Sequence, residues 1–307
     1  MLRDLDQFEF CHLRLHLELL SEVTLPEFAL LRLRRDLRRA ALRVLGPGSA
    51  FTTLFDPPLA DDPESVRRYQ RPGPAFVLRP TLLDTTRLGI GDRLAMELLL
   101  VGRGIRYATE LLSSLEELGR NGLWAKEGQF ALSAAAVVDA DGKERSLANF
   151  GLTLGSSLPR ISGRWFLDSL PFSSRWRLTF VTPARLLVDN RPLFRGSLQR
   201  LVPFVLRRVT SMAHAHCGVE LITDSQLLLS HSAGLAVRES RLLWKDWRAI
   251  ETDGENHDLG GLIGAVSFDS PVEEDLLSLL QIGSLLGLGR GAAYGAGRYR
   301  LEPADDI

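Results

Sequence analysis

The sequence predicts an α+β protein built from two tandem βαββαβ units. Stretches in which apolar and polar residues alternate are typical of half-buried strands, and apolar residues spaced three and four apart are typical of amphipathic helices. These patterns follow one another in the same order twice along the 307 residues. Both copies also carry a Leu-Gly-Arg run where the second helix ends, which indicates an internal duplication.

The first unit is expected to open with a strand over residues 8–19, where Cys11, Leu13 and Leu15 alternate with His12, Arg14 and His16. An amphipathic helix should follow Pro26 and stop at Gly46. The remaining elements are strands over 74–81 and 92–102, a helix over 106–119 and a strand over 128–138.

The second unit repeats this order. Its expected elements are a strand over 176–188, a helix over 192–216 that includes Pro203, strands over 240–250 and 260–268, a helix over 272–286 and a strand over 292–301. The sequence therefore predicts domains over 1–150 and 176–307, joined by a linker over 151–175 with a turn or hairpin of its own. An order of βαββαβ is the ferredoxin-like arrangement, in which both helices cover one face of a four-stranded antiparallel sheet.

The charge of the chain is balanced, but its cations are almost all arginine. The formal net charge is -1, and lysine occurs only at positions 126, 143 and 245 among the 37 basic residues. A GC-rich genome favours arginine codons, so the placement of the arginines is more informative than their number. Arginine is also the cation that forks onto phosphates and stacks on bases.

Arginines gather on the first predicted helix. The segment from 31 to 45 contains one acid, Asp36, and six arginines: Arg32, Arg34, Arg35, Arg38, Arg39 and Arg43. This face could simply be solvated. However, like charges four residues apart disfavour a helix, and an RNA backbone would supply the missing anions.

The C-terminal segment is rich in glycine, with Gly287, Gly289, Gly291, Gly295 and Gly297 close together. Arg290, Tyr294 and Arg298 alternate with these glycines, which favours a surface for phosphates and bases. A tight turn that needs glycine only for packing is the plain alternative. A dinucleotide-binding fingerprint is disfavoured, because a helix precedes the glycines and a strand follows them.

Metal and membrane binding are not expected. We expect Cys11 and Cys217 to be free thiols of a cytoplasmic protein. Two cysteines cannot form a zinc site alone, and His12 and His16 lack a third ligand for a metal ion. No run reaches the roughly 20 apolar residues of a membrane-spanning helix. His214 and His216 are read as the end of a helix that packs into the core.

Most of the chain resembles the CRISPR repeat-cleaving endoribonucleases of the RAMP superfamily, which process precursor CRISPR RNA. The most specific match is LLGLGRGAAYGAGRY at the C-terminus; LRLRRDLRRAAL, FTTLFDPP, PAFVLRP, LTFVTPARL, VLRRVTSMAHAHCG, LLWKDW and GGLIGAVSF support it in that order. The resemblance implies tandem ferredoxin-like domains that act as a monomer or homodimer. It also implies metal-independent cleavage of repeat RNA to a 2′,3′-cyclic phosphate, without a cofactor, and CRISPR effector subunits as further partners.

Two departures from the family leave the catalytic residues open. Many members have a histidine in the first helix, where this chain has Arg39, and another before the glycine loop, where it has Gly287-Leu288-Gly289-Arg290. We therefore expect His16 to act as the acid–base group, with Arg35 and Arg39 stabilising the phosphorane. Two alternatives are a repeat-binding subunit that does not cleave and a tandem ferredoxin-like protein that binds a small ligand or a protein.

The RNA-binding residues expected beside this catalytic group come from the first helix and the glycine loop. They are Arg32, Arg34, Arg38, Gly287, Gly289, Arg290, Gly291, Tyr294, Gly295, Gly297 and Arg298.

Overall fold

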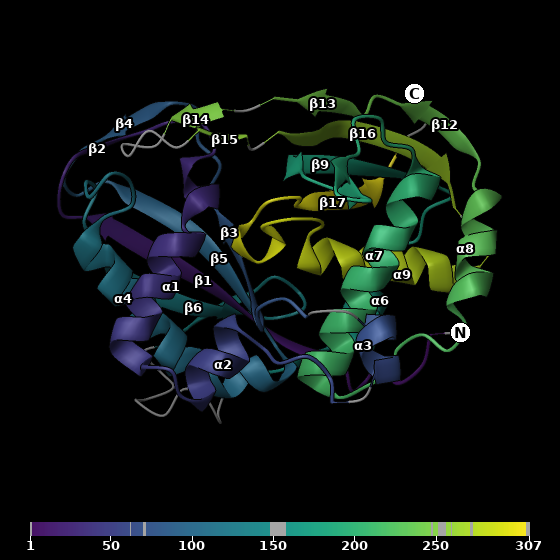
Figure 1. Cartoon of the computed structure of the whole chain (residues 1–307), viewed down its shortest axis with the longest axis horizontal. Coiled ribbons are helices and arrows are strands. Elements are labelled where there is room, and N and C mark those ends of the chain that lie inside the picture. The colour runs from purple at the N-terminus through teal and green to yellow at the C-terminus, as the bar shows by residue number, and fades with distance from the viewer. Residues whose placement is uncertain are drawn as a thin grey trace. The chain divides into compact units, whose positions relative to one another are not determined.

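The computed structural model describes residues 2–61, 63–69, 72–147, 158–246, 248–250, 256–258, 260–270 and 273–304 (Figure 1). The chain divides into two compact units. The first unit comprises Glu9–Ser162, and the second comprises Met1–Phe8 together with Gly163–Ile307. Each unit is built around its own antiparallel sheet.

The sheet of the first unit has the strand order β3-β5-β1-β6-β7, and β8 also pairs with β1. Its strands are β1 (Glu9–Leu19), β3 (Phe76–Pro80), β5 (Arg93–Val101), β6 (Phe130–Val138), β7 (Glu144–Ser146) and β8 (Ile161–Ser162). The first strand lies between the third and fourth strands of the predicted unit, which is the ferredoxin-like order. The predicted fold class is confirmed.

Two long helices, α1 (Arg34–Leu45) and α4 (Ala108–Asn121), pack against each other on the apolar face of this sheet (Figure 1). Leu13, Leu15 and Leu17 of β1 are fully buried, because alternate side chains of a strand point to the same face. Shorter elements connect this framework: β2 (Val23–Leu25), which pairs with β4 (Thr86–Leu88), the 3₁₀ turns η1 (Ala29–Arg32) and η2 (Gly102–Tyr107), and the helices α2 (Ser49–Phe55) and α3 (Pro63–Tyr69).

The first helix begins later than its sequence pattern predicts. Phe28 adopts a left-handed conformation with φ 59°, and the chain then makes the separate turn η1 before α1 starts at Arg34. Arg32 therefore lies in η1 and outside α1. Apolar spacing does not distinguish a 3₁₀ turn from the first turn of an α-helix, so the pattern could not locate this break.

The second unit repeats the arrangement with the strand order β12-β16-β9-β17, and β13 also pairs with β16. Its strands are β9 (Arg175–Ala184), β12 (Val237–Ser240), β13 (Leu243–Lys245), β16 (Gly261–Asp269) and β17 (Tyr299–Pro303). Its helices are α6 (Gly163–Asp168), α7 (Leu198–Met212), α8 (Ser225–Ala233) and α9 (Glu274–Leu286). Two small hairpins pair β10 (Leu187–Val188) with β11 (Arg191–Pro192) and β14 (Arg248–Ile250) with β15 (Asn256–Asp258).

Three predicted elements of the second unit differ from the structure. The predicted strand over 240–250 is divided between β13 and β14, and the helix over 192–216 starts at Leu198, where the Ser197 hydroxyl caps it. The final strand begins at Tyr299, because the glycine-rich residues before it fold as a loop around a 3₁₀ turn, η5 (Ala292–Tyr294). Within the predicted linker, residues 151–157 lie outside the described residues, and the part that is described contains β8 and α6 in place of a hairpin.

Candidate nucleic-acid interface

The glycine loop that follows α9 is closely packed against the end of β9. The amide of Gly297 donates to the Pro183 carbonyl at 2.9 Å, and the amide of Arg290 donates to the Arg185 carbonyl at 3.0 Å. The Thr182 hydroxyl donates to the Gly295 carbonyl at 2.7 Å. The loop is therefore fixed on the sheet by hydrogen bonds.

The loop requires glycine for two reasons: positive φ angles and the lack of room for a Cβ atom. Gly289 and Gly297 have φ angles of 81° and 61°, a region that other residues rarely occupy. A Cβ atom at Gly297 would lie 1.9 Å from the Leu288 carbonyl oxygen, and one at Gly289 would lie 2.4 Å from that of Arg185. Packing explains much of the glycine content, as the plain alternative predicts.

One short stretch of the loop nevertheless keeps free donors. Among the described residues, the amides of Gly289 and Gly291 have no hydrogen-bond partner, and neither does the side chain of Arg290. Gly289 and Arg290 are exposed, and Gly291 is partly exposed. Two amides and a guanidinium on three consecutive residues form a donor set suited to a single phosphate.

Other loop residues are less available than the sequence suggests. Tyr294 is only 4% exposed, so its ring offers no stacking surface in this structure, because the loop folds over it. Arg298 is partly exposed, and its amide donates to the Thr182 hydroxyl at 2.8 Å. Tyr299 is also buried, and its hydroxyl donates to the Leu280 carbonyl at 2.6 Å. Burial raises the pKa of Tyr299 well above its ordinary value.

The arginines of the first unit have more acidic partners than the sequence indicates. Arg38 forms an ion pair with Asp56 at 3.1 Å, and Arg43 forms one with Glu117 at 2.9 Å. Hydrogen bonds from Arg120 and from Arg43 hold the pKa of Glu117 below its ordinary value. Asp56 and Glu117 are distant in sequence, so the expectation of a helix almost without acidic partners is wrong.

The remaining arginines of this group differ in their surroundings. The guanidinium of Arg32 lies over the Trp124 ring at 5.3 Å, and those of Arg35 and Arg39 lie 3.6 and 3.8 Å from the single carboxylate of Asp36. Arg34 is exposed, and no described residue contacts its side chain as a partner. Arg34, Arg35 and Arg39 are therefore exposed cations of α1, and Arg34 has no partner among the described residues.

His16 lies on the opposite face of the sheet from these arginines. It shares a face of β1 with His12 and Arg14, and its backbone partners on the neighbouring strands are Ala95 and Ala134. These small neighbours leave the imidazole partly exposed. Because α1 covers the other face, the structure does not bring His16 together with Arg35 or Arg39, and the three residues cannot form the single catalytic group expected from the sequence.

An ion-pair cluster that sequence patterns did not reveal lies near His16. The Oε1 atom of Glu97 lies 3.5 Å from Arg14, and its Oε2 atom lies 3.7 Å from Arg79 and 3.6 Å from the Nε2 atom of His12. Arg14 also contacts Glu144. The alternation of β1 predicted which side chains share this face, but the partners from β3, β5 and β7 depend on strand register. The acids partly neutralise this face.

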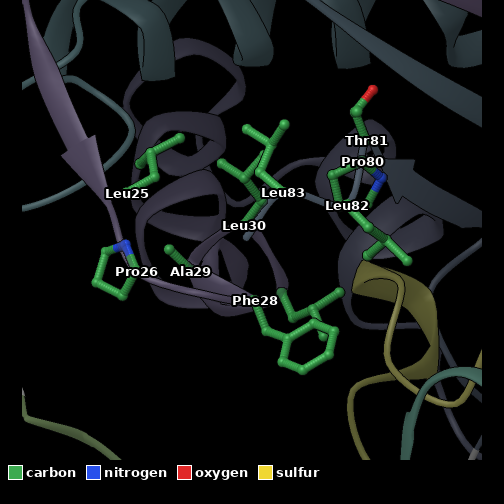
Figure 2. A pocket seen from close by; sticks show the side chains of 10 residues that line it. Leu25, Pro26, Phe28, Ala29, Leu30, Pro80, Thr81, Leu82 and Leu83 are labelled. Carbon is green, nitrogen blue, oxygen red and sulfur yellow. The ribbon is translucent and has the colours of Figure 1, made fainter. Parts of the chain in front are cut away.

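A pocket in the first unit is lined almost entirely by apolar side chains (Figure 2). They come from the segment that leads into α1 and from the residues after β3: Leu25, Pro26, Phe28, Ala29, Leu30, Leu31, Pro80, Thr81, Leu82 and Leu83. The hydroxyl of Thr81 donates to the Ala95 carbonyl. The pocket therefore offers no acid–base group for catalysis.

The described residues also contain no group of three His, Cys, Asp or Glu side chains arranged to hold a metal ion. Neither Cys11 nor Cys217 forms a disulfide, and burial raises the pKa of Cys11 to about 12. Among the helices that the structure describes, none has the length and apolar character needed to cross a membrane.

Residues 178–299 match the family model of the CRISPR-associated endoribonuclease Cas6. This part of the chain is similar to Cas6. Residues 8–153 match a second model, described as an N-terminal domain. The Cas6 match spans β9, α7, α9 and the glycine loop, and it confirms the resemblance to the CRISPR repeat-cleaving endoribonucleases. No curated protein sequence matches the chain.

Solved structures with the same fold include Cas6 proteins along nearly their whole length. A Cas6 product complex has a TM-score of 0.54 at 16% identity, covering 96% of this chain and 99% of that one. Thermus thermophilus Cas6 has a TM-score of 0.51 at 12% identity, with 96% and 98% covered. These likenesses show that the chain shares the tandem ferredoxin-like fold of those proteins.

Longer proteins also contain this fold. A partial Cas6-RT-Cas1–Cas2 complex has a TM-score of 0.58 at 14% identity and covers 98% of this chain. The chain spans 48% of that protein's length, and 30% of the chain in a second Cas6-RT-Cas1–Cas2 structure.

Proposed function

We propose that this protein binds CRISPR repeat RNA and cleaves it without a metal ion, leaving a 2′,3′-cyclic phosphate. The observation that carries the proposal is the Cas6 match over residues 178–299, which includes the donor set of Gly289, Arg290 and Gly291. A double-stranded repeat stem would be recognised through its shape and its phosphates, because side chains cannot read the narrow major groove of A-form RNA.

The amides of Gly289 and Gly291 and the guanidinium of Arg290 would together hold one phosphate. The exposed arginines of α1, Arg34, Arg35 and Arg39, would supply further phosphate contacts. Each such contact adds affinity that weakens as salt rises, because binding releases condensed counterions.

Cleavage by the 2′-hydroxyl needs a base for that hydroxyl, an acid for the leaving 5′ oxygen and positive charge near the phosphorane. Arginine stays protonated and is a poor base, whereas imidazole can serve as acid or base near neutral pH. We assign the acid–base role to His16 because it is partly exposed between two alanines. Arg35 and Arg39 are assigned to RNA binding, since the sheet lies between them and His16.

A second function, repeat binding without cleavage, is favoured by one observation. Arg39 occupies the place where many relatives have a histidine, and the glycine loop contains no histidine either. Such a protein would serve as a subunit of a larger CRISPR complex, as in the Cas6-RT-Cas1–Cas2 complexes.

The experiment that separates the two functions incubates the purified protein with repeat RNA from its own locus in EDTA. The cleavage proposal predicts a product that ends in a 2′,3′-cyclic phosphate, and it predicts that His16→Ala slows single-turnover cleavage at least 100-fold. His231→Gln, in the second unit, serves as the histidine control and should cleave at the wild-type rate. Tight binding without any product would support the non-cleaving function, and unchanged cleavage by His16→Ala would remove His16 from the mechanism.

A further inference from the structure

A partly exposed aromatic pair in the second unit has no role in the site described above. Phe194, in the loop between β11 and α7, is 59% exposed. Its ring packs edge-on against the indole of Trp244 on β13, with the two centroids 4.8 Å apart and the planes at 63°. Trp244 is partly exposed. Large aromatic side chains are costly to leave in water, so the exposed ring of Phe194 indicates a contact surface.

The indole is held in place by its surroundings. Its Nε1 atom donates to the Asp246 carboxylate at 2.7 Å. Gly260 lies against the ring, and a Cβ atom there would approach the indole within 2.8 Å. The ring is therefore positioned before any ligand arrives, which lowers the entropy cost of binding on it.

Exposed arginines lie close to Phe194 in the sequence, on both sides of it. Arg191, Arg195 and Arg200 are all exposed, and no described carboxylate lies within ion-pair distance of any of them. The guanidinium of Arg200 donates only to the Arg195 carbonyl, at 3.2 Å. The surface thus combines an aromatic pair with exposed arginines.

Strand pairing places the aromatic pair at the same end of the sheet as the glycine loop. Trp244 pairs with Leu262 of β16, and Leu262 pairs with Ala184 at the end of β9. The next residue, Arg185, accepts the hydrogen bond from the Arg290 amide. Two strand spacings of ~5 Å each therefore separate the backbone of Trp244 from the strand that carries the loop.

We propose that Phe194 and Trp244 form a stacking platform for a single-stranded segment of RNA, with Arg191, Arg195 and Arg200 on its phosphates. Aromatic rings that stack on bases and a groove of cations that follows the backbone are the usual means of binding single strands without a strict sequence requirement. The proposal rests on the proposed RNA-binding function and extends it from the repeat stem to the nucleotides next to it.

Phe194→Ala tests the platform in the full-length protein. The probes are the repeat stem-loop alone, the same stem-loop with a single-stranded extension, and a short oligouridylate, each with a 2′-deoxy sugar at any cleavage site. Phe194→Ala should weaken binding of the extended and single-stranded probes about 5- to 30-fold, as expected for the loss of one stacked base, and leave the stem-loop nearly unaffected. Arg195→Gln should lower the salt slope for oligouridylate by about 0.7.

Three further variants identify the kind of contact. Phe194→Tyr keeps the ring and should bind as the wild type does, whereas Phe194→Leu keeps only apolar area and should be as weak as Phe194→Ala. Phe172→Ala removes another highly exposed ring, 96% exposed, and should change nothing. The proposal is overturned if Phe194→Ala binds all probes like the wild type. It is also overturned if Phe194→Leu binds as well as Phe194→Tyr, because a requirement for apolar area without a ring would indicate a docking surface for protein.

The same measurements distinguish failure of the platform from failure of the proposed function. If the wild type does not bind the stem-loop but Phe194→Ala still weakens oligouridylate binding, the platform stands and repeat recognition fails. If the stem-loop binds tightly and the extension adds no affinity, repeat recognition stands and the platform fails.

Discussion

The substitution Gly297→Ala tests whether the packing of the glycine loop is as tight as the structure indicates. Gly297 has a φ of 61°, and its added Cβ would lie 1.9 Å from the Leu288 carbonyl oxygen. The neighbouring backbone must move, and two hydrogen bonds depend on it. These are the bond from the Leu288 amide to the Gly297 carbonyl and the bond from the Gly297 amide to the Pro183 carbonyl, both 2.9 Å.

The expected loss of unfolding free energy is the sum of the backbone strain and the weakened hydrogen bonds. A non-glycine residue in the left-handed region costs about 1–2 kcal/mol, and each weakened hydrogen bond costs about 1 kcal/mol. We therefore expect Gly297→Ala to lower the free energy of unfolding by about 3–4 kcal/mol. Gly218 is the matched control in the same unit, because its φ is 73° and no atom lies within 4 Å of an added Cβ. Gly218→Ala should cost only about 1–2 kcal/mol.

Urea unfolding followed by circular dichroism measures both variants against the wild type. The difference between them isolates the steric effect, because the backbone strain is similar in the two. If Gly297→Ala loses no more stability than Gly218→Ala, the loop has room for a side chain, and packing does not explain its glycines.

Three other predictions concern single side chains. The guanidinium of Arg208 donates only to the Leu286 carbonyl, at 3.4 Å, and burial lowers its pKa to about 10. Arg208→Met removes this charge. In urea unfolding, the variant should be as stable as the wild type or more stable by about 1 kcal/mol. Burial raises the pKa of Cys11 from 9.0 to about 12, so its stabilising effect is complete below pH 9 and is lost as pH rises toward 12. The free energy of unfolding should fall by up to about 1.4 kcal/mol per pH unit in that window, and the fall should be shallower in Cys11→Ala. Arg34→Ala should leave stability within about 0.5 kcal/mol of the wild type and lower the salt slope of RNA binding by about 1 in a titration of labelled repeat RNA.

The architecture was predictable because it rests on local periodicity. The alternation along β1 identified which side chains are buried and which share a face with His16, and the repeated order of elements led to the two ferredoxin-like sheets. The break before α1 could not be seen, since it depends on the left-handed conformation of Phe28. The pattern predicts a strand that includes part of the glycine loop, because apolar residues alternate with glycines there. The prediction fails because the backbone turns at each glycine, where φ is positive.

The candidate site was less predictable because its details depend on contacts between distant residues. Asp56, which follows α2, reaches Arg38, and Glu117 of α4 reaches Arg43. Nothing in the local pattern of the arginines reveals these partners. The burial of Tyr294 follows from how the loop folds back on itself. The separation of His16 from Arg35 and Arg39 follows from the layer order of the fold, in which a helix and the polar side of the first strand lie on opposite faces of one sheet.

The central claim is that the glycine loop holds a phosphate of the repeat RNA through Arg290 and its neighbouring amides. The measurement that tests it most directly is the dissociation constant of uncleavable repeat RNA for the wild type, Arg290→Ala and Arg300→Ala over a range of salt. Arg300 is an exposed arginine on β17 and serves as the control. We expect that, of the two variants, only Arg290→Ala binds about 10-fold more weakly and has a salt slope lower by about 1. Equal affinities and equal slopes for all three proteins would contradict it.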